Sequence, residues 1–284
     1  MTESEFRRPR LAVSNLAWPG SDDGAVAELL HAGGVGGVEV APCKLWRHAP
    51  SVPAGVAEAY AAWWKAEGCA VVALQALFFG HPELTIFGDG ETLAATQRHL
   101  VAMGELAARC GAPVLVLGAP GSRKRGRRAM PSAITAAAVA LRPVAEQLAP
   151  LGVTLCIAPI PPRYGCNFVT TAAEAAVLAD AVSHPNFGVH LDATALALSD
   201  EVSEGALAPV MKHVRHVHVS ELDLAPVGTT SSVPHGQLGA ALRALGYAGW
   251  HSIEFRVGED AAWRDTLARA LDVARRNYGT DDGR

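Results

Sequence analysis

Eight short apolar segments recur along the chain and alternate with longer segments rich in alanine and leucine. The intervals between their starts run from 26 to 43 residues. The starts lie near Leu11, Gly37, Val71, Val114, Val153, Phe187, Val214 and His251. A unit of one strand, one helix and two loops needs about 30 residues. Each interval therefore predicts one β-strand followed by one α-helix, and the whole chain predicts eight such units.

Eight consecutive strand–helix units are typical of a closed (β/α)8 barrel, the α/β fold called the TIM barrel, which takes about 250 residues. The alternative is an open doubly wound sheet, in which G-x-G-x-x-G follows the first strand of a nucleotide-binding protein. Here the first strand continues into residues 14–18 (SNLAW), and the glycine-rich segment 33–37 precedes a strand. We therefore predict a single TIM-barrel domain over residues 1–284, with frayed ends at 1–9 and 278–284, and no nucleotide cofactor.

The composition excludes several classes of protein. Half of the residues are hydrophobic and 18% are charged, a balance typical of globular proteins and not of disordered chains. The formal net charge of −4 gives no basic surface for nucleic acid, and no run of about 18 apolar residues predicts a membrane span. The five cysteines include no C-x-x-C pair, and the N-terminus has no signal-peptide core, so we expect a reduced, cytoplasmic protein. The sequence leaves a homo-oligomer open.

Strand alternation predicts which side chains point into the barrel, because successive residues of a strand face opposite sides. On the last three predicted strands it places Asp192, His218 and Glu254 inside, at the ends where barrel enzymes carry their active sites. Two carboxylates and one imidazole suit a divalent cation such as Mn²⁺, Co²⁺, Mg²⁺ or Zn²⁺. Buried carboxylates at close range also repel each other unless a cation or a proton compensates. The alternative is a hydrogen-bonded polar cluster without metal.

Two further charged residues at strand ends are candidates for the same pocket. Glu39 points inward at the end of the second predicted strand, as a base, an acceptor for a ligand hydroxyl, or the partner of a buried arginine. Arg256 lies two residues beyond Glu254. It can bind a carboxylate or phosphate, or it can form an ion pair with Glu221 or Asp223 at the rim.

Two histidines and one cysteine also point inward. We expect His190 and His216 to be core histidines, and His216 can in addition orient the imidazole of His218. Cys156 lies on the fifth predicted strand, where an apolar environment keeps it a thiol and a poor nucleophile. The sequence has no G-x-S-x-G or Walker motif, so neither a serine nucleophile nor a phosphate-binding loop is predicted.

The loops after three predicted strands supply candidate substrate-binding residues. Gln75 and His81 follow the third strand, and Tyr164 and Asn167 lie in the proline-stiffened loop after the fifth, where they can hydrogen-bond a ligand. The loop after the fourth strand holds five of the 24 basic residues within positions 121–128. It can bind an anionic substrate, or it can be an ordinary solvated loop.

Three segments in the C-terminal third carry a recognisable pattern: 185–192 (PNFGVHLD), 216–221 (HVHVSE) and 246–254 (GYAGWHSIE). Together they resemble the sugar phosphate isomerase/epimerase family, the xylose-isomerase-like TIM barrels, a group that also includes AP-endonuclease-like enzymes. The segments 14–18 and 36–40 are similar to that family as well, so the resemblance covers almost the whole chain. It implies a TIM barrel, a divalent metal near its axis, and proton transfer on a polyol or keto-sugar.

The resemblance implies four metal ligands: a Glu on strand five, an Asp on six, a His on seven and a Glu on eight. Asp192, His218 and Glu254 match the last three positions, but Ala158 stands at the first. Ala195 likewise stands where many members have a substrate-contacting His. Family epimerases use the strand-five and strand-eight Glu on opposite faces of a substrate carbon. Alanine can neither bind metal nor move a proton, so a two-Glu epimerisation is disfavoured.

We therefore expect an isomerase- or epimerase-like enzyme, or a dehydratase, that acts on a sugar, cyclitol or similar small molecule. Glu254 is the expected proton-transfer group and a ligand of a three-ligand metal site, which is common in catalytic centres. His235 follows the seventh strand, where relatives often have Asp-His, and is a catalytic candidate or an exposed histidine at a helix N-terminus. The alternatives are a metal-free enzyme using Glu254, Glu39 or a histidine, and a protein that only binds a ligand or partner.

Overall fold

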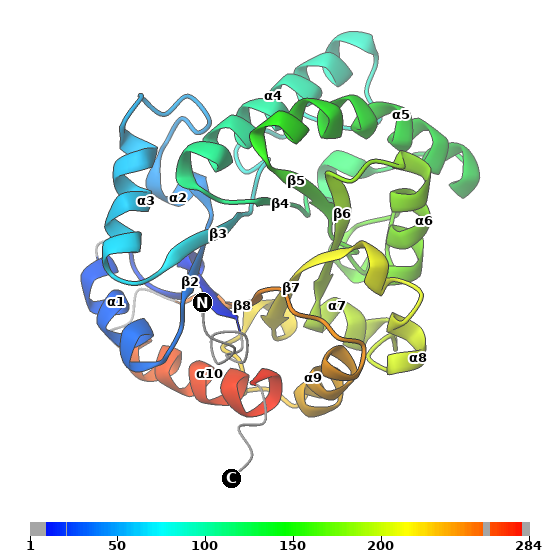
Figure 1. Ribbon diagram of the computed structural model, residues 1–284. Coiled ribbons are helices and arrows are strands. Elements are labelled where there is room, and N and C mark those ends of the chain that lie inside the picture. The colour runs from blue at the N-terminus through cyan, green and yellow to red at the C-terminus, as the bar shows by residue number, and fades with distance from the viewer. Residues whose placement is uncertain (1–9, 21, 258–261, 280–284) are drawn as a thin grey trace.

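The computed structural model describes residues 10–20, 22–257 and 262–279. Eight parallel strands close into a barrel in chain order, with β1 paired to β8 (Figure 1). The strands are β1 Leu11–Ser14, β2 Gly37–Val40, β3 Ala70–Leu74, β4 Val114–Leu117, β5 Thr154–Ile157, β6 Phe187–Asp192, β7 Val214–Ser220 and β8 His251–Glu254. Each strand begins within one residue of the predicted position, and the predicted (β/α)8 barrel is confirmed.

Helices surround the barrel on the outside (Figure 1). The α-helices are α1 Asp23–Ala32, α2 Pro42–Leu45, α3 Val56–Ala66, α4 Gly90–Cys110, α5 Met130–Leu148, α6 Ala172–Val182, α7 Ala193–Leu198, α8 Glu204–Leu207, α9 His235–Ala244 and α10 Trp263–Tyr278. The short 3-10 helices are η2 Asn15–Ala17, η3 Pro120–Arg123, η4 Ala149–Leu151, η5 Pro162–Tyr164, η6 Met211–His213 and η7 Leu222–Leu224. In the described part of the chain, no helix combines the length and apolar character that a membrane span needs.

The prediction of one helix in each interval is wrong at two places. A short helix, α2 or α7, begins almost directly after β2 and β6, so these intervals hold two α-helices each. At β6 the reason is local, because the side chain of Asp192 accepts a hydrogen bond from the backbone N–H of Ala195 and caps α7. The carboxylate that ends the strand therefore also starts a helix.

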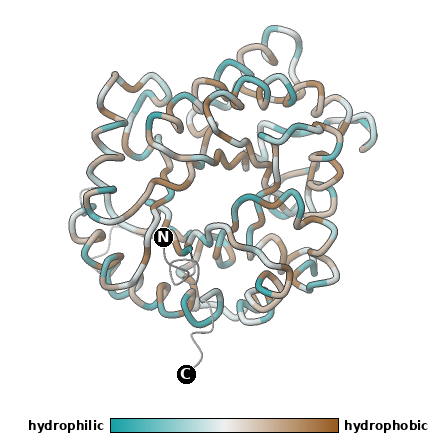
Figure 2. Tube along the Cα trace, viewed as in Figure 1, coloured by the Kyte–Doolittle hydropathy of each residue, from teal (hydrophilic) through white to brown (hydrophobic). Residues whose placement is uncertain are grey.

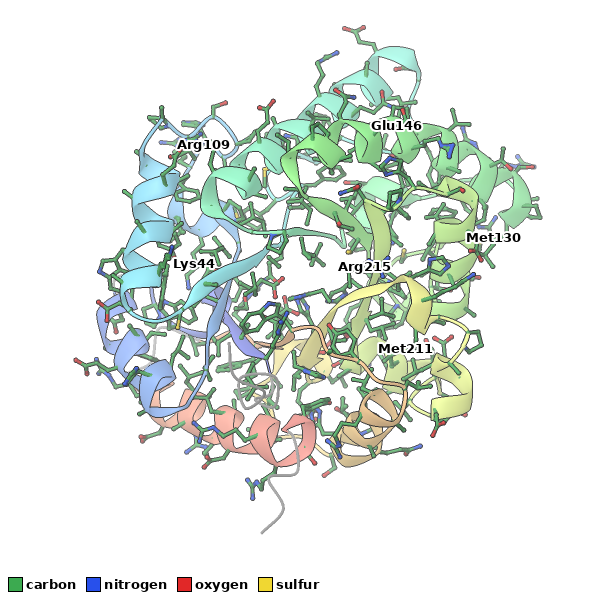
Figure 3. All side chains as sticks on the ribbon, viewed as in Figure 1. Lys44, Arg109, Met130, Glu146, Met211 and Arg215 are labelled. Atoms are coloured by element: carbon green, nitrogen blue, oxygen red, sulfur yellow. The ribbon has the colours of Figure 1, made fainter. Side chains whose placement is uncertain are left out.

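The apolar core has an outer and an inner part. Leu155 and Ile157 of β5 belong to the large cluster between barrel and helices, whereas Cys156 and Ala158 belong to a small cluster inside the barrel. This split confirms the predicted alternation. Burial raises the pKa of Cys156 to about 12, which keeps it a thiol as predicted. Figure 2 shows β3, β4 and β5 as mostly hydrophobic, and Figure 3 shows Arg109 and Glu146 at the outer edge of the ring.

The C-terminal end of the fold differs from the prediction. Fraying was predicted from position 278, but Tyr278 is the last residue of α10 and only 2% exposed. Its hydroxyl group hydrogen-bonds Nδ1 of His235 at 2.7 Å, which fixes this end of the helix against α9. The predicted frayed residues 1–9 and 280–284 lie outside the described part of the chain.

Candidate active site

A cavity of about 690 Å³ opens at the carboxyl ends of the strands. The three predicted metal ligands line it, as do four of the five predicted substrate-binding residues. These residues are Asp192, His218, Glu254, Gln75, His81, Tyr164 and Arg256. The barrel thus brings together in one cavity side chains that lie up to 181 positions apart in the sequence.

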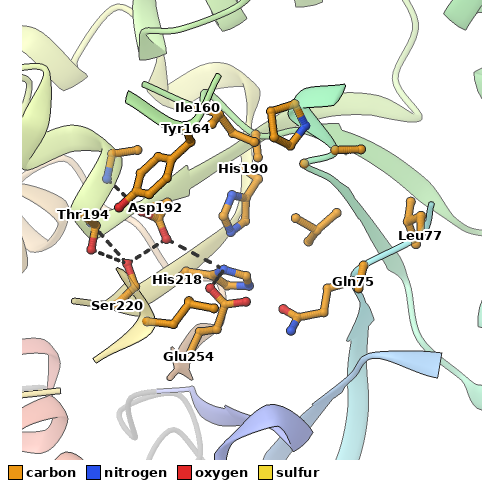
Figure 4. A pocket seen from close by; sticks show the side chains of 18 of the residues that line it. Gln75, Leu77, Ile160, Tyr164, His190, Asp192, Thr194, His218, Ser220 and Glu254 are labelled. Carbon is orange, nitrogen blue, oxygen red and sulfur yellow. Dashed lines mark hydrogen bonds and ion pairs between the residues drawn. The ribbon is translucent and has the colours of Figure 1, made fainter. Parts of the chain in front are cut away.

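The side chains of Asp192, His218 and Glu254 converge on one point (Figure 4). Their ligand atoms all lie within 4.8 Å of one another. Nδ1 of His218 is 3.1 Å from Oε2 of Glu254 and 4.0 Å from Oδ2 of Asp192. The Asp192 carboxylate is held in place, because Ser220 Oγ donates to Oδ2 at 2.7 Å and the N–H of Ala195 donates to Oδ1 at 2.8 Å.

Glu39 lies directly behind this group and orients it. Its carboxylate oxygens are 2.9 and 3.0 Å from Nε2 of His218, and one of them is 3.0 Å from Nε2 of His216. The side chain of Glu39 is fully buried and is not among the cavity-lining residues. The structure therefore does not match the expectation that Glu39 is a base facing the substrate or the partner of a buried arginine. Glu39 binds the far side of the His218 ring, which turns Nδ1 toward the cavity.

The charges in this cluster compensate one another. Burial raises the pKa of Glu39, but the imidazoles of His218 and His216 outweigh it and hold that pKa well below its ordinary value. Burial lowers the pKa of His218, but Glu39 and Glu254 outweigh it and hold that pKa well above its ordinary value. Burial raises the pKa of Asp192, against the opposing effect of His218. The metal-free site is thus stabilised by an imidazolium between two carboxylates.

This donor set fits a divalent cation. The Nδ1 atom of His218 and the carboxylate oxygens of Asp192 and Glu254 face the same point, and Glu39 fixes the imidazole by binding Nε2. A ligating histidine almost always has such a partner on its other ring nitrogen. Ala158 lines the cavity without supplying a donor. Three protein ligands with open positions are typical of catalytic metal centres, whereas structural sites are closed.

Comparison with known proteins identifies the family. The family model described as "Xylose isomerase-like TIM barrel" matches residues 27–276. The chain belongs to this family. A comparison with curated proteins finds no match.

Solved structures of similar fold include three epimerases. D-Psicose 3-epimerase with D-tagatose from Clostridium cellulolyticum H10 is 17% identical, with a TM-score of 0.79 over 95% of this chain and 99% of that chain. An L-ribulose 3-epimerase is 19% identical, with a TM-score of 0.75 over 95% and 92%. The 3-keto-D-glucoside 4-epimerase from E. coli is 19% identical, with a TM-score of 0.75 over 93% and 99%. At these identities the likeness shows a shared fold.

His190 was interpreted from the sequence as a core histidine, but in this xylose isomerase-like barrel it lines the cavity. It is 1% exposed, and neither ring nitrogen has a hydrogen-bond partner among the described residues. Its ring packs edge-on against His218, with 4.1 Å between the centroids. Burial and the neighbouring His218 hold the pKa of His190 well below its ordinary value, so the ring is neutral with one free donor and one free acceptor.

His190 lies next to Ala158, the position at which the family pattern has a glutamate. Ile157 of β5 pairs with Val189 of β6, so Ala158 and His190 are the next residues along neighbouring strands. The alternation of β6 correctly placed His190 inside the barrel. Nothing in the sequence indicated that His190 lacks hydrogen-bond partners, because such partners would come from side chains of other strands at the same height in the barrel.

The structure does not bring the predicted catalytic residue His235 to the cavity. Its Nε2 lies 3.2 Å from Oε1 of Glu221 and its Nδ1 lies 2.7 Å from the hydroxyl group of Tyr278. It is 7% exposed and not among the cavity-lining residues. Both ring nitrogens are thus engaged in a buried network that ties α9 to α10. The alternative of an exposed histidine at a helix N-terminus is wrong as well.

Asn167 and the basic side chains of the loop 121–128 also lie away from the cavity, although Gly121 and Ser122 of this loop line it. The side-chain oxygen of Asn167 accepts a hydrogen bond from the N–H of Arg125 at 2.9 Å, so it joins two loops and is not among the lining residues. Among the described lining residues there is none of the five basic side chains of this loop. Arg123 turns inward instead, where its Nη2 donates to the carbonyl oxygen of Ala158 at 2.5 Å.

Arg256, which the sequence offered as an anion-binding residue, lines the cavity with an exposed side chain. The alternative ion pairs with Glu221 or Asp223 do not form. Asp223 pairs with Arg163 at 3.2 Å. Within the described ranges, no ion pair of the Arg256 guanidinium with a carboxylate is found.

Proposed function

We propose that the protein is a divalent-metal-dependent isomerase or epimerase that acts on a sugar-like, polyhydroxylated small molecule. One observation carries the proposal: Asp192, His218 and Glu254 place two carboxylates and one imidazole nitrogen within 4.8 Å of one another in the cavity. Membership of the xylose isomerase-like family and the likeness to epimerases of D-psicose, L-ribulose and a 3-keto-D-glucoside support the same class.

Glu254 is the proposed proton-transfer group. Its side chain is 14% exposed at the end of β8 and lines the cavity, so one carboxylate oxygen can reach a substrate carbon. Asp192 and His218 would hold the cation together with Glu254. When bound, the cation supplies positive charge next to a substrate carbonyl oxygen, which stabilises the negative charge formed on proton removal.

Gln75 is the proposed partner of a substrate hydroxyl. Its Nε2 donates to Ser14 Oγ at 2.9 Å, and this contact fixes the amide. Its Oε1 is buried against the cavity without a partner among the described residues. A buried acceptor without a partner costs free energy, and a ligand hydroxyl placed there recovers it.

The reaction outcome depends on the face opposite Glu254. Epimerisation needs a proton donor or acceptor there, and Ala158 provides neither. We propose that His190, the neighbour of Ala158 on β6, takes this position with its free imidazole nitrogens. If Glu254 acts alone, the proton returns to the same face of the substrate, and the reaction is an isomerisation between neighbouring carbons. The stereochemistry of the product therefore distinguishes the two outcomes.

The test combines metal content with hydrogen exchange. Protein dialysed against Mn²⁺, Co²⁺, Mg²⁺ or Zn²⁺ is analysed by elemental mass spectrometry, and each loaded form is incubated with keto-hexoses and keto-pentoses in D₂O. We expect near-stoichiometric metal, and solvent deuterium on a substrate carbon observed by NMR. Asp192→Asn should lose both, whereas Glu146→Gln, at an exposed carboxylate on α5 that pairs with Arg142, should lose neither.

Two results would contradict the proposal. Exchange that survives chelation and the Asp192→Asn substitution would show catalysis without metal. Metal-loaded protein that exchanges no hydrogen on any keto-sugar would show that the site does not serve this class of substrate.

A further inference from the structure

The cavity has two chemically different sides. The side built by β6, β7 and β8 carries Asp192, His218, Glu254 and the hydroxyl group of Ser220. The side built by β4 and the segments after β3, β4 and β5 is mostly apolar, with Leu77, Phe78, Phe79, Val116, Ile160 and Pro161 among its lining residues, and its polar members are Gln75, His81, Ser122 and Tyr164. Figure 4 shows Leu77 across the cavity from Asp192 and Ser220.

The apolar side is preformed and open to a ligand. His99 of α4 holds the segment after β3, because its Nε2 lies 2.8 Å from the carbonyl oxygen of Leu77 and its ring packs edge-on against Phe78 at 5.5 Å. Phe79 in the same segment is 70% exposed although it lines the cavity. A large exposed aromatic side chain at the mouth of a cavity is typical of a ligand-binding surface.

A free sugar leaves this surface largely uncovered. Its hydroxyl groups remain in water or meet the polar side, and any hydroxyl group pressed against Leu77 or Ile160 loses water without gaining a partner. Each such loss weakens binding by roughly 5- to 150-fold. A volume of about 690 Å³ also lies within the range that holds drug-sized ligands, about 300–1,000 Å³. The polar side accommodates the hydroxylated part of a ligand, and the apolar side accommodates an apolar group.

We propose that the substrate is a sugar or polyol that carries an apolar aryl or alkyl substituent, bound with its hydroxylated part at Asp192, His218 and Glu254 and its substituent against Leu77, Phe79 and Ile160. The inference rests on the proposed function for the hydroxylated part. Two departures from the family pattern also make the cavity more apolar. Ala158 and Ala195 both line it at positions where the resemblance implies a carboxylate and an imidazole.

Equilibrium binding of matched glycosides tests the proposal without requiring turnover. Phenyl and methyl β-D-glucopyranoside, galactopyranoside and xylopyranoside are titrated by calorimetry into the protein, with and without Mn²⁺. We expect at least one phenyl glycoside to bind ten-fold or more tightly than its methyl counterpart. Phe79→Ser should remove most of this preference and still fold, because the side chain is largely exposed in the free protein.

The matched control is Val139→Ser, which changes a similarly exposed apolar side chain, 67% exposed, on α5 and outside the cavity. It should leave the preference unchanged. Ile160→Ser is the second test variant, since Ile160 lines the cavity from the segment after β5. The proposal is overturned if no phenyl glycoside binds more tightly than its methyl counterpart, or if Phe79→Ser and Ile160→Ser both leave the preference intact.

The outcomes separate this inference from the proposed function. Phenyl glycosides that bind through Phe79, in a protein that exchanges hydrogen neither on free keto-sugars nor on the 3-keto derivative of phenyl β-D-glucopyranoside, would support the inference and contradict the proposed function. Hydrogen exchange on free keto-sugars, without any preference for phenyl glycosides, would support the proposed function and overturn the inference.

Discussion

Glu39→Gln isolates the contribution of a fully buried carboxylate that does not line the cavity. The substitution keeps the side-chain volume and one acceptor oxygen, but it removes the negative charge that lies 2.9 and 3.0 Å from Nε2 of His218. The imidazole then has only a neutral acceptor behind it, so Nδ1 becomes a weaker ligand. Loss of such a partner typically lowers metal affinity by about 10- to 100-fold. This corresponds to about 1.4 to 2.8 kcal/mol.

The assay is a calorimetric titration of chelator-treated protein with Mn²⁺ or Co²⁺ at neutral pH, with circular dichroism to verify that the variant folds. Glu221→Gln is the matched control. Glu221 is 1% exposed and also contacts a histidine, His235, but it does not touch His218. We expect Glu221→Gln to bind the ion as the parent protein does, while the Kd of Glu39→Gln rises by at least ten-fold.

Two results would refute this reasoning. If Glu39→Gln binds the ion within about two-fold of the parent protein, then the carboxylate behind His218 does not tune the ligand. If Glu221→Gln weakens binding as much as Glu39→Gln, then the effect belongs to any buried carboxylate–histidine pair and not to the one that orients Nδ1.

Three further predictions concern His190, the buried Glu39–His218 pair and Arg123. His190→Leu should leave metal affinity unchanged but lower inversion at the substrate carbon by about 100-fold, because Glu254 still exchanges its proton while the group proposed for the opposite face is gone, and NMR combined with titration checks both. Urea unfolding of metal-free protein should show stability falling below pH 4.5, since the depressed pKa of Glu39 gives stability that is lost on acidification. Stability should also fall above pH 6.5, since the raised pKa of His218 gives stability that is lost as the imidazolium deprotonates. Arg123→Met should keep or raise the stability measured with urea, because two nitrogens of the buried guanidinium have no partners among the described residues. A loss of stability above about 2 kcal/mol would contradict this prediction.

The barrel could be predicted from the sequence because its signals are local and repeated. An apolar run followed by a helical segment recurs with enough room for one unit each time, and the strands therefore start where predicted. Alternation along β6 and β7 gave the inward positions of Asp192 and His218 for the same reason. In a strand, the side of a residue depends only on its own position.

The roles of Glu39 and His235 could not be predicted in this way. Alternation places Glu39 inside the barrel, but its partners His216 and His218 are 177 and 179 residues away. His235 was a catalytic candidate only through the resemblance, but it begins α9 well after the end of β7, and its ring contacts Glu221 and Tyr278 at the end of α10. In both cases the role depends on which groups from distant segments meet the side chain.

The sequence by itself determined that this chain forms a parallel (β/α)8 barrel and that Asp192, His218 and Glu254 point into it, because periodicity is a property of single strands. Only the tertiary structure decided that Glu39 is buried behind His218, that His190 beside Ala158 has no hydrogen-bond partner among the described residues, and that the far side of the cavity is mostly apolar. These features arise because closing the barrel sets the level at which side chains from all eight strands meet. Burial, charge compensation and unpaired donors all depend on these contacts between side chains of different strands.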